Sequence, residues 1–162
     1  MREKIWYEMV HIKHGDSYLA HYLFRQKSNK KWFKILILVF STGGVFGWKI
    51  WEGVPIIACA LIAVFQIFNL IENQIIISDK EIEKISELRN KYVLYFNKLE
   101  KLWSDFDAER FDEKEATEQF YILRKDGADI EALDNELDIR TIKKLCGKAD
   151  LESRNYISQY HS

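Results

Sequence analysis

Apolar side chains gather in two long runs within the first half of the chain and recur in regular patterns elsewhere. The first run, residues 32–51, has roughly the 20 residues that a helix needs to cross a bilayer. Glu52 and Gly53 form a turn, and Pro55 suits the first turn of a second helix over residues 55–77. This pattern predicts an all-α membrane protein built on a two-helix transmembrane hairpin. The alternative is a pair of long helices buried in an ordinary hydrophobic core.

Cationic residues flank both apolar runs on the same side of the predicted hairpin. They are Arg25, Lys27, Lys30, Lys31 and Lys34 before or within the first run, and Lys80, Lys84, Arg89 and Lys91 after the second. The positive-inside rule then predicts a membrane location with both termini in the cytoplasm. Residues 1–31 have an amphipathic helical pattern, which predicts a helix either in the cytoplasm or at the inner surface of the membrane, with a break expected at Gly15 and Asp16. Residues 78–162 are expected to form a cytoplasmic helical region.

A new helix is predicted directly after the second run, because Ser78 and Glu81 have the spacing of a capping box. Its apolar residues follow a heptad rhythm, which we call the seam. The seam comprises Ile85, Leu88, Tyr92, Tyr95, Leu99, Leu102 and Phe106. Such a seam needs a partner, which is either another copy of the chain, in a homo-oligomer, or the chain's own later helices.

The last third of the sequence predicts a series of shorter helices. Asp112, followed three residues later by Glu115, resembles a helix start, and Gly127 should end the helix that it opens. Further helices are expected at residues 130–137, at residues 139–146 with Gly147 as the stop, and at residues 151–160. This part of the chain is therefore expected to be helical with several breaks.

The second apolar run has one small and polar face. At about 100° per residue, the residues that share this face are Cys59, Ala63, Gln66, Asn69 and Asn73. Polar side chains are costly against lipid, so this stripe should either line a pore or form hydrogen bonds between helices. In the first run, Gly43 and Gly47 form a Gly-x-x-x-Gly motif, which permits close packing of helices.

Charge restricts where an anionic ligand could bind. With 24 Lys and Arg against 25 Asp and Glu, the net charge of −1 gives no basis for bulk binding of polyanions. Any such site must be local, and one basic run with tyrosines downstream is a candidate. It comprises Arg140, Lys143, Lys144 and Lys148, followed by Tyr156 and Tyr160. This run either holds a phosphate-bearing ligand or is a solvated helix face.

Catalytic and metal-binding patterns are weak. His11, His14 and His21 share one side of the predicted N-terminal helix, but no carboxylate or thiol cluster accompanies them, which favours packing over a metal site. Cys59 and Cys146 have no pairing pattern, which indicates a reducing compartment. No phosphate loop, activated nucleophile or pair of catalytic carboxylates stands out. We therefore expect neither an enzyme nor a bound cofactor.

The layout of residues 18–103 resembles the SLATT family, two-transmembrane effectors of bacterial antiphage defence. The resemblance rests on a basic helical N-terminal segment, a short-looped hairpin that contains Ser41, Thr42, Gly43 and Gly44, and a long polar helix that bears Tyr92, Tyr95 and Leu99. It implies an inner-membrane channel that self-associates and responds to a nucleotide signal. The segment after Phe111 is similar to effectors of Hailong-type systems, which implies an oligonucleotide made by a partner nucleotidyltransferase.

The expected function is therefore an oligomeric pore-forming effector in the bacterial inner membrane, gated through its cytoplasmic helices. One hairpin cannot enclose a water path, but several copies can, with Gln66, Asn69 and Asn73 facing inward. The alternative is a non-conducting membrane anchor or scaffold that recruits a partner through the seam. An ion-flux measurement separates the two.

Overall fold

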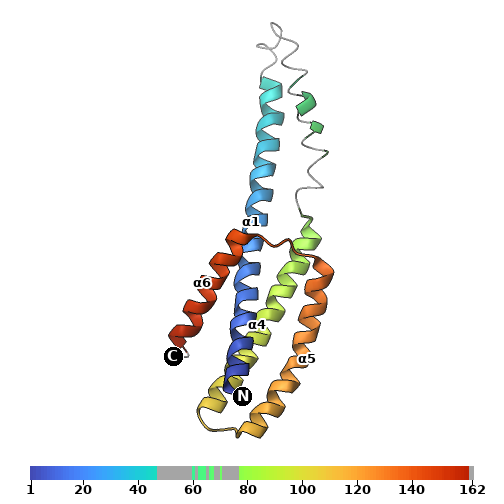
Figure 1. Ribbon diagram of the computed structural model, residues 1–162. Helices are drawn as coiled ribbons and strands as arrows, with labels where there is room; N and C mark the ends of the chain where they lie inside the picture. Colours follow the sequence, from blue (N-terminus) through green and yellow to red (C-terminus); the bar gives the residue numbers. More distant parts are fainter. Residues whose placement is uncertain (47–59, 61, 65, 68–69, 71–76, 161–162) are drawn as a thin grey trace. The chain divides into compact units, whose positions relative to one another are not determined.

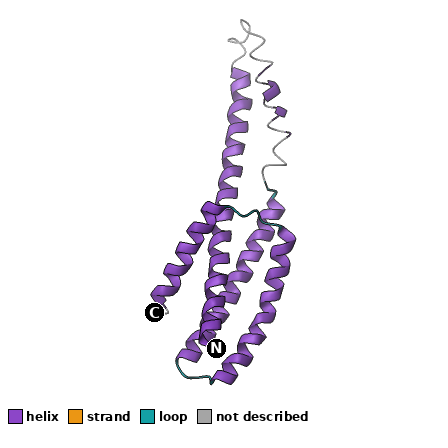
Figure 2. Ribbon diagram, viewed as in Figure 1, coloured by secondary structure: helices purple, strands orange, loops and turns teal. Residues whose placement is uncertain are grey.

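The computed structural model describes residues 1–46, 60, 62–64, 66–67, 70 and 77–160 of the 162-residue chain. Its principal helices, labelled in Figure 1, are α1 (Arg2–Phe46), α4 (Asp79–Asp107), α5 (Glu113–Leu137) and α6 (Lys143–Tyr160). Over these residues the regular structure is helical and no strand is present (Figure 2). The all-helical content predicted from the sequence is confirmed.

The chain divides into two compact units. Unit 1 comprises Met1–Leu23 together with Glu83–Ser162, and unit 2 comprises Phe24–Ile82. Within unit 1 the first half of α1 contacts both α4 and α6, and α4 also contacts α5 (Figure 1). The beginning of the chain thus folds together with its last 80 residues, Glu83–Ser162.

The core of unit 1 begins with the apolar face of α1. The buried residues on this face are Ile5, Met9, Ile12, Leu19, Tyr22 and Leu23, spaced mostly three or four positions apart. Their amphipathic pattern is therefore explained by packing inside the protein. The other helices of unit 1 cover this face as far as Leu23, and a cytoplasmic or interfacial position for residues 1–31 stays a prediction.

The seam of α4 forms the other half of the same core. All seven seam residues are buried except Phe106, which is half-buried. The Tyr95 hydroxyl donates to Oε1 of Glu8 on α1 at 3.1 Å, and the Tyr92 ring lies against Gly15 of α1. Burial raises the pKa of Tyr92 to about 12 and also raises the pKa of Tyr95. The chain's own helices cover the seam: α5 is one of the later helices that the sequence predicted, whereas α1, with Glu8 and Gly15, precedes the seam in the chain.

The helix α1 is continuous through Gly15, so the predicted break there is wrong. A Cβ atom placed on Gly15 would overlap the Tyr92 ring, because α1 and α4 approach closely at this point. Glycine at this position thus permits close packing of two helices, and the packing outweighs the roughly 1 kcal/mol by which glycine disfavours a helix interior.

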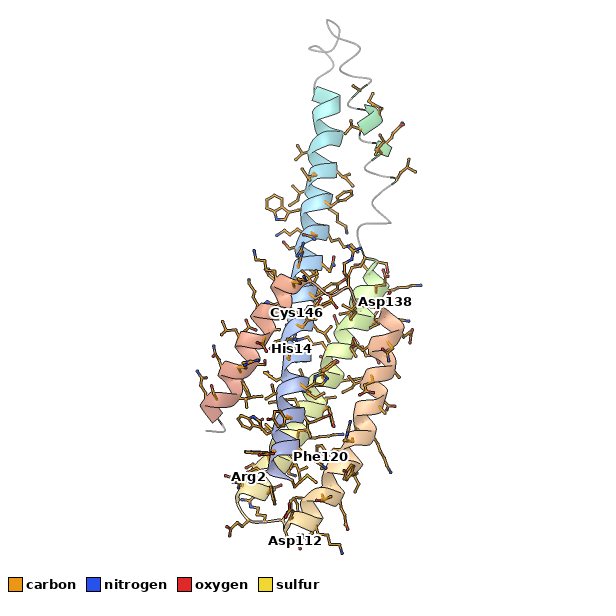
Figure 3. The ribbon with its side chains drawn as sticks, viewed as in Figure 1. Arg2, His14, Asp112, Phe120, Asp138 and Cys146 are labelled. Atoms are coloured by element: carbon orange, nitrogen blue, oxygen red, sulfur yellow. The ribbon has the colours of Figure 1, made fainter. Side chains whose placement is uncertain are left out.

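Both capping boxes expected from the sequence are present. The Ser78 amide donates to Oε2 of Glu81 at 2.7 Å, and the Glu81 amide donates to Oγ of Ser78 at 3.2 Å. At the start of α5 the Glu115 amide donates to Oδ1 of Asp112 at 2.7 Å, and the Asp112 amide donates to Oε2 of Glu115 at 3.1 Å. Figure 3 shows Asp112 at this end of α5 and Asp138 at the other. Each box satisfies amides that the first turn of a helix leaves without partners.

The helix ends predicted at glycines are wrong. Gly127 lies inside α5, and Gly147 lies inside α6, with no steric conflict at either position. α5 continues to Leu137 and ends where Asp138 has a left-handed backbone, with φ of 42°. α6 begins only at Lys143, so residues 130–137 belong to α5, residues 143–146 and 151–160 belong to α6, and residues 139–142 lie between the two helices.

Polar contacts connect α1 to other parts of unit 1. The side chain of Asp16 is 9% exposed and accepts a hydrogen bond from Nε of Arg89 on α4 at 2.9 Å. The Tyr18 hydroxyl donates to the carbonyl oxygen of Arg140 at 2.6 Å and accepts from the amide of Ile142 at 3.2 Å. The Arg89 bond joins α1 to α4, and the two bonds of Tyr18 hold the segment between α5 and α6 against α1.

The predicted transmembrane hairpin is wrong for the part of the chain that the structure describes. None of its helices combines the length and the apolar composition that crossing a bilayer requires. The first run, residues 32–51, is described only as far as residue 46. Most of residues 55–77 lie outside the described residues. The membrane fold and the inner-membrane location are corrected together, and the bilayer as a partner stays a prediction.

Candidate functional site: two faces of one segment of α1

The polar stripe expected to line a pore is only partly described. Ala63 and Gln66 are exposed to solvent, whereas Cys59, Asn69 and Asn73 lie outside the described residues. A pore lining requires membrane-spanning helices around it, and no described helix meets that requirement.

The Gly-x-x-x-Gly motif is also divided. Gly43 lies in the last turns of α1, and Gly47 lies outside the described residues. Close packing of a second helix at Gly43 and Gly47 stays a prediction, since the described residues include only one half of the motif.

The basic run expected to hold a phosphate lies around the start of α6, and its members Arg140, Lys143, Lys144 and Lys148 are all exposed. The expected stacking platform does not accompany it, because the Tyr156 ring packs 5.7 Å from the Phe96 ring and its hydroxyl donates to Glu100 at 3.3 Å. Tyr160 is the last residue of α6. The structure places these lysines as an exposed helix face.

The three histidines lie on α1 and do not converge. His21 pairs with Oε1 of Glu152 on α6 at 2.9 Å, and His14 lies on the same helix (Figure 3). Among the described residues, no group of three His, Cys, Asp or Glu side chains has the geometry of a metal site.

Unit 2 contains a groove that the sequence did not single out. Its volume is about 450 Å³, and four lysines of α1 line it together with the beginning of α4. The complete lining is Lys27, Lys30, Lys31, Lys34, Ile35, Leu38, Asp79 and Ile82. The lysines recur at intervals of three and four residues, so successive turns of α1 present them on one face. We call this site the lysine groove.

The charge of the lysine groove is unbalanced. Four lysines face one carboxylate, which leaves an excess of three positive charges. Lys30 pairs with Oδ1 of Asp79 at 2.6 Å, and this is the one ion pair of the four lysines among the described residues. The hydrogen bond and charge of Lys30, with a smaller contribution from Lys34, lower the pKa of Asp79 below its usual value. Asp79 is thus a carboxylate at neutral pH, and Lys27, Lys31 and Lys34 remain available to an anion.

The opposite side of the same helix segment is apolar and exposed. Trp32, Leu36 and Val39 follow one another at intervals of four and three residues, and their exposed fractions are 63%, 49% and 58%. At about 100° per residue they fall within a narrow sector, roughly half a turn away from Lys30 and Lys34. We call these three residues the apolar stripe. Unit 2 exposes further large apolar side chains at Ile62, Val64, Ile67 and Leu70.

The sequence analysis does not predict the lysine groove, although it assigns a role to the same four lysines. Lys27, Lys30, Lys31 and Lys34 were interpreted as positive charges that orient a membrane hairpin. Their helical spacing was visible in the sequence and could have indicated a basic face. The other wall comes from Asp79 and Ile82, more than 40 residues further along the chain, and only the tertiary structure brings that wall to the lysines.

Together these observations define a helical protein in which one helix segment carries a basic groove and an apolar stripe on opposite faces. No protein-family model, curated protein or solved structure matches this chain. The resemblance to the SLATT family therefore stays a prediction.

Proposed function

We propose that this chain is a non-enzymatic helical subunit that assembles with copies of itself through the apolar stripe. The observation that supports the proposal is the exposure of Trp32, Leu36 and Val39 at helical spacing on one side of α1. An exposed stripe of this kind is typical of a surface that packs against another protein, and tryptophan is among the residues that contribute most to such contacts.

A second copy of the chain suits the apolar stripe for two reasons. In a two-fold arrangement with antiparallel helices, Trp32 of one copy meets Val39 of the other, so apolar side chains contact apolar side chains. Lys30 and Lys34 lie about half a turn away from the stripe, and Lys31 lies about a quarter of a turn from Trp32, so the like charges stand outside this contact. The stripe itself contains no charged residue, which removes a common obstacle to self-association.

This proposal keeps one part of the expected function and drops another. Homo-oligomer formation is retained, and the resemblance to self-associating SLATT effectors supports it. The pore is not retained, since it depended on the transmembrane hairpin. The alternative scaffold that recruits a partner through the seam loses its surface, because Leu88, Tyr95 and Leu99 are buried in unit 1.

The mass of the purified particle tests the proposal. The parent chain, of 19.3 kDa, is expected to elute as a dimer or larger species in size-exclusion chromatography with light scattering. Leu36→Asp places a charge in the apolar stripe and should weaken self-association at least about tenfold, which is about 1.4 kcal/mol. Leu151→Asp on α6 is the matched control, because Leu151 is also exposed, at 63%, but lies outside the stripe.

The control should keep the mass of the parent. A parent that elutes with the mass of a single chain would contradict the proposal. So would a Leu36→Asp variant whose concentration dependence of mass equals that of the parent. Far-ultraviolet circular dichroism of each variant establishes that the helices are intact.

A further inference from the structure

The lysine groove has the composition of an anion site with an apolar wall. Its lysine side chains come from successive turns of α1, and about 10 Å of helix separates Lys27 from Lys34. This spread exceeds one phosphate group and fits a ligand with several anionic groups in a row. Lysine ammonium groups bind phosphate oxygens as mobile point charges, which suits a flexible chain of phosphates.

We propose that the lysine groove binds a small organic polyphosphate, with the phosphate chain on Lys27, Lys31 and Lys34 and the organic body against Ile35, Leu38 and Ile82. This site is distinct from the apolar stripe and does not depend on self-association. The excess of three positive charges suits a strongly anionic ligand such as a nucleoside triphosphate, which carries about four negative charges at neutral pH.

The single carboxylate of the groove does not block such a ligand. Asp79 has an exposed side chain, at 85%, and its charge is already paired with Lys30, whose side chain is 18% exposed. The three other lysines have no ion-pair partner among the residues that the structure describes. An entering phosphate chain therefore gains three cations without displacing an existing ion pair.

The apolar wall distinguishes an organic polyphosphate from an inorganic one. Ile82 is buried, at 9% exposure, and it lines the groove beside Ile35 and Leu38. The groove volume of about 450 Å³ falls within the range of small-molecule sites, which runs from roughly 300 to 1,000 Å³. A base or other flat body can bury its apolar surface on this wall, and inorganic tripolyphosphate has no such body.

Isothermal titration calorimetry of the full chain with ATP and with sodium tripolyphosphate tests the proposal. The parent should bind ATP more tightly than tripolyphosphate, and both affinities should fall steeply as salt increases. The double variant Lys31→Gln with Lys34→Gln should lose at least about tenfold in ATP affinity, equivalent to about 1.4 kcal/mol. The matched control is Lys143→Gln with Lys144→Gln, two exposed lysines on α6, and it should bind as the parent does.

Four outcomes would overturn the proposal. Equal ATP affinity in the parent and in the Lys31 and Lys34 variant would place binding elsewhere, and a loss confined to the α6 control would place it at the basic run. Equal affinities for ATP and tripolyphosphate would show that the organic part of the ligand does not contribute to binding. A last arm uses vesicles that contain phosphatidylglycerol: binding to the vesicles without saturable binding of ATP would assign the groove to lipid headgroups instead.

Discussion

At the scale of single residues, the close approach of α1 to α4 depends on one missing side chain. Gly15 faces the Tyr92 ring, and the ring is only 8% exposed, so surrounding atoms restrict its movement. In most helix interiors glycine is a defect, because its backbone has more freedom to lose on folding. Here the same residue makes room for a buried aromatic ring. The consequence is that one substitution should have opposite effects at two glycines of this chain.

Gly15→Ala should lower the free energy of unfolding by about 1 to 3 kcal/mol, because the added methyl group overlaps the Tyr92 ring. Gly147→Ala in α6 is the matched control. Nothing lies within 4 Å of a Cβ atom at Gly147, so this change should raise the free energy of unfolding by roughly 0.5 to 1 kcal/mol. Urea denaturation followed by circular dichroism measures both values. If Gly15→Ala is as stable as Gly147→Ala, the close packing of α1 on α4 is wrong.

At the scale of single elements, local rules determine where the helices begin better than where they end. The starts of α4 and α5 have reciprocal capping boxes that four residues of sequence specify. The ends are different, because α5 stops at Leu137 and not at Gly127. A cap forms from side chains close in sequence, whereas continuation through a glycine depends on what the next turns pack against. Ile130, for example, is buried beyond Gly127.

Asp112→Ala should lower the free energy of unfolding by about 1 kcal/mol, because the Glu115 amide loses its acceptor at the start of α5. Asp112→Asn retains a side-chain oxygen for that amide and should cost only a few tenths of a kcal/mol through the weaker interaction with the helix dipole. Thermal and urea unfolding of the two variants beside the parent measure the difference. An Asn variant as unstable as the Ala variant would show that charge, and not the hydrogen bond, matters at this cap.

At the scale of the whole molecule, the seam is buried by other helices of the same chain. The residues Met1–Leu23 return to pack with Glu83–Ser162, so the heptad pattern of α4 serves the core of unit 1. Self-association, where it occurs, has to use another surface. The exposed apolar side chains of unit 2 form such a surface. A change in the seam should then alter the free energy of unfolding and leave the mass of the particle unchanged.

Leu99→Asp tests this division of roles, because Leu99 is fully buried on α4. The variant should lose at least about 3 kcal/mol of unfolding free energy, since a carboxylate is placed in an apolar core. Leu94→Asp is the matched control, as Leu94 lies on the same helix and is 62% exposed, and its effect should stay within about 0.5 kcal/mol. A Leu99→Asp variant with the melting temperature of the parent but a smaller particle mass would show that the seam is an interface between copies.

The sequence by itself determined the helical class, both capping boxes and the apolar positions of the seam, because each depends on residues within one or two helical turns. It could not decide what covers an apolar face: a bilayer, a second copy and a neighbouring helix all satisfy the same periodicity. The tertiary structure decided this for the seam, which α1 covers through Glu8 and Gly15. It also decided the lysine groove, because the wall that contains Asp79 and Ile82 reaches the lysines of α1 only through folding. Burial and enclosure are properties of distant segments brought together, and spacing along one segment does not contain them.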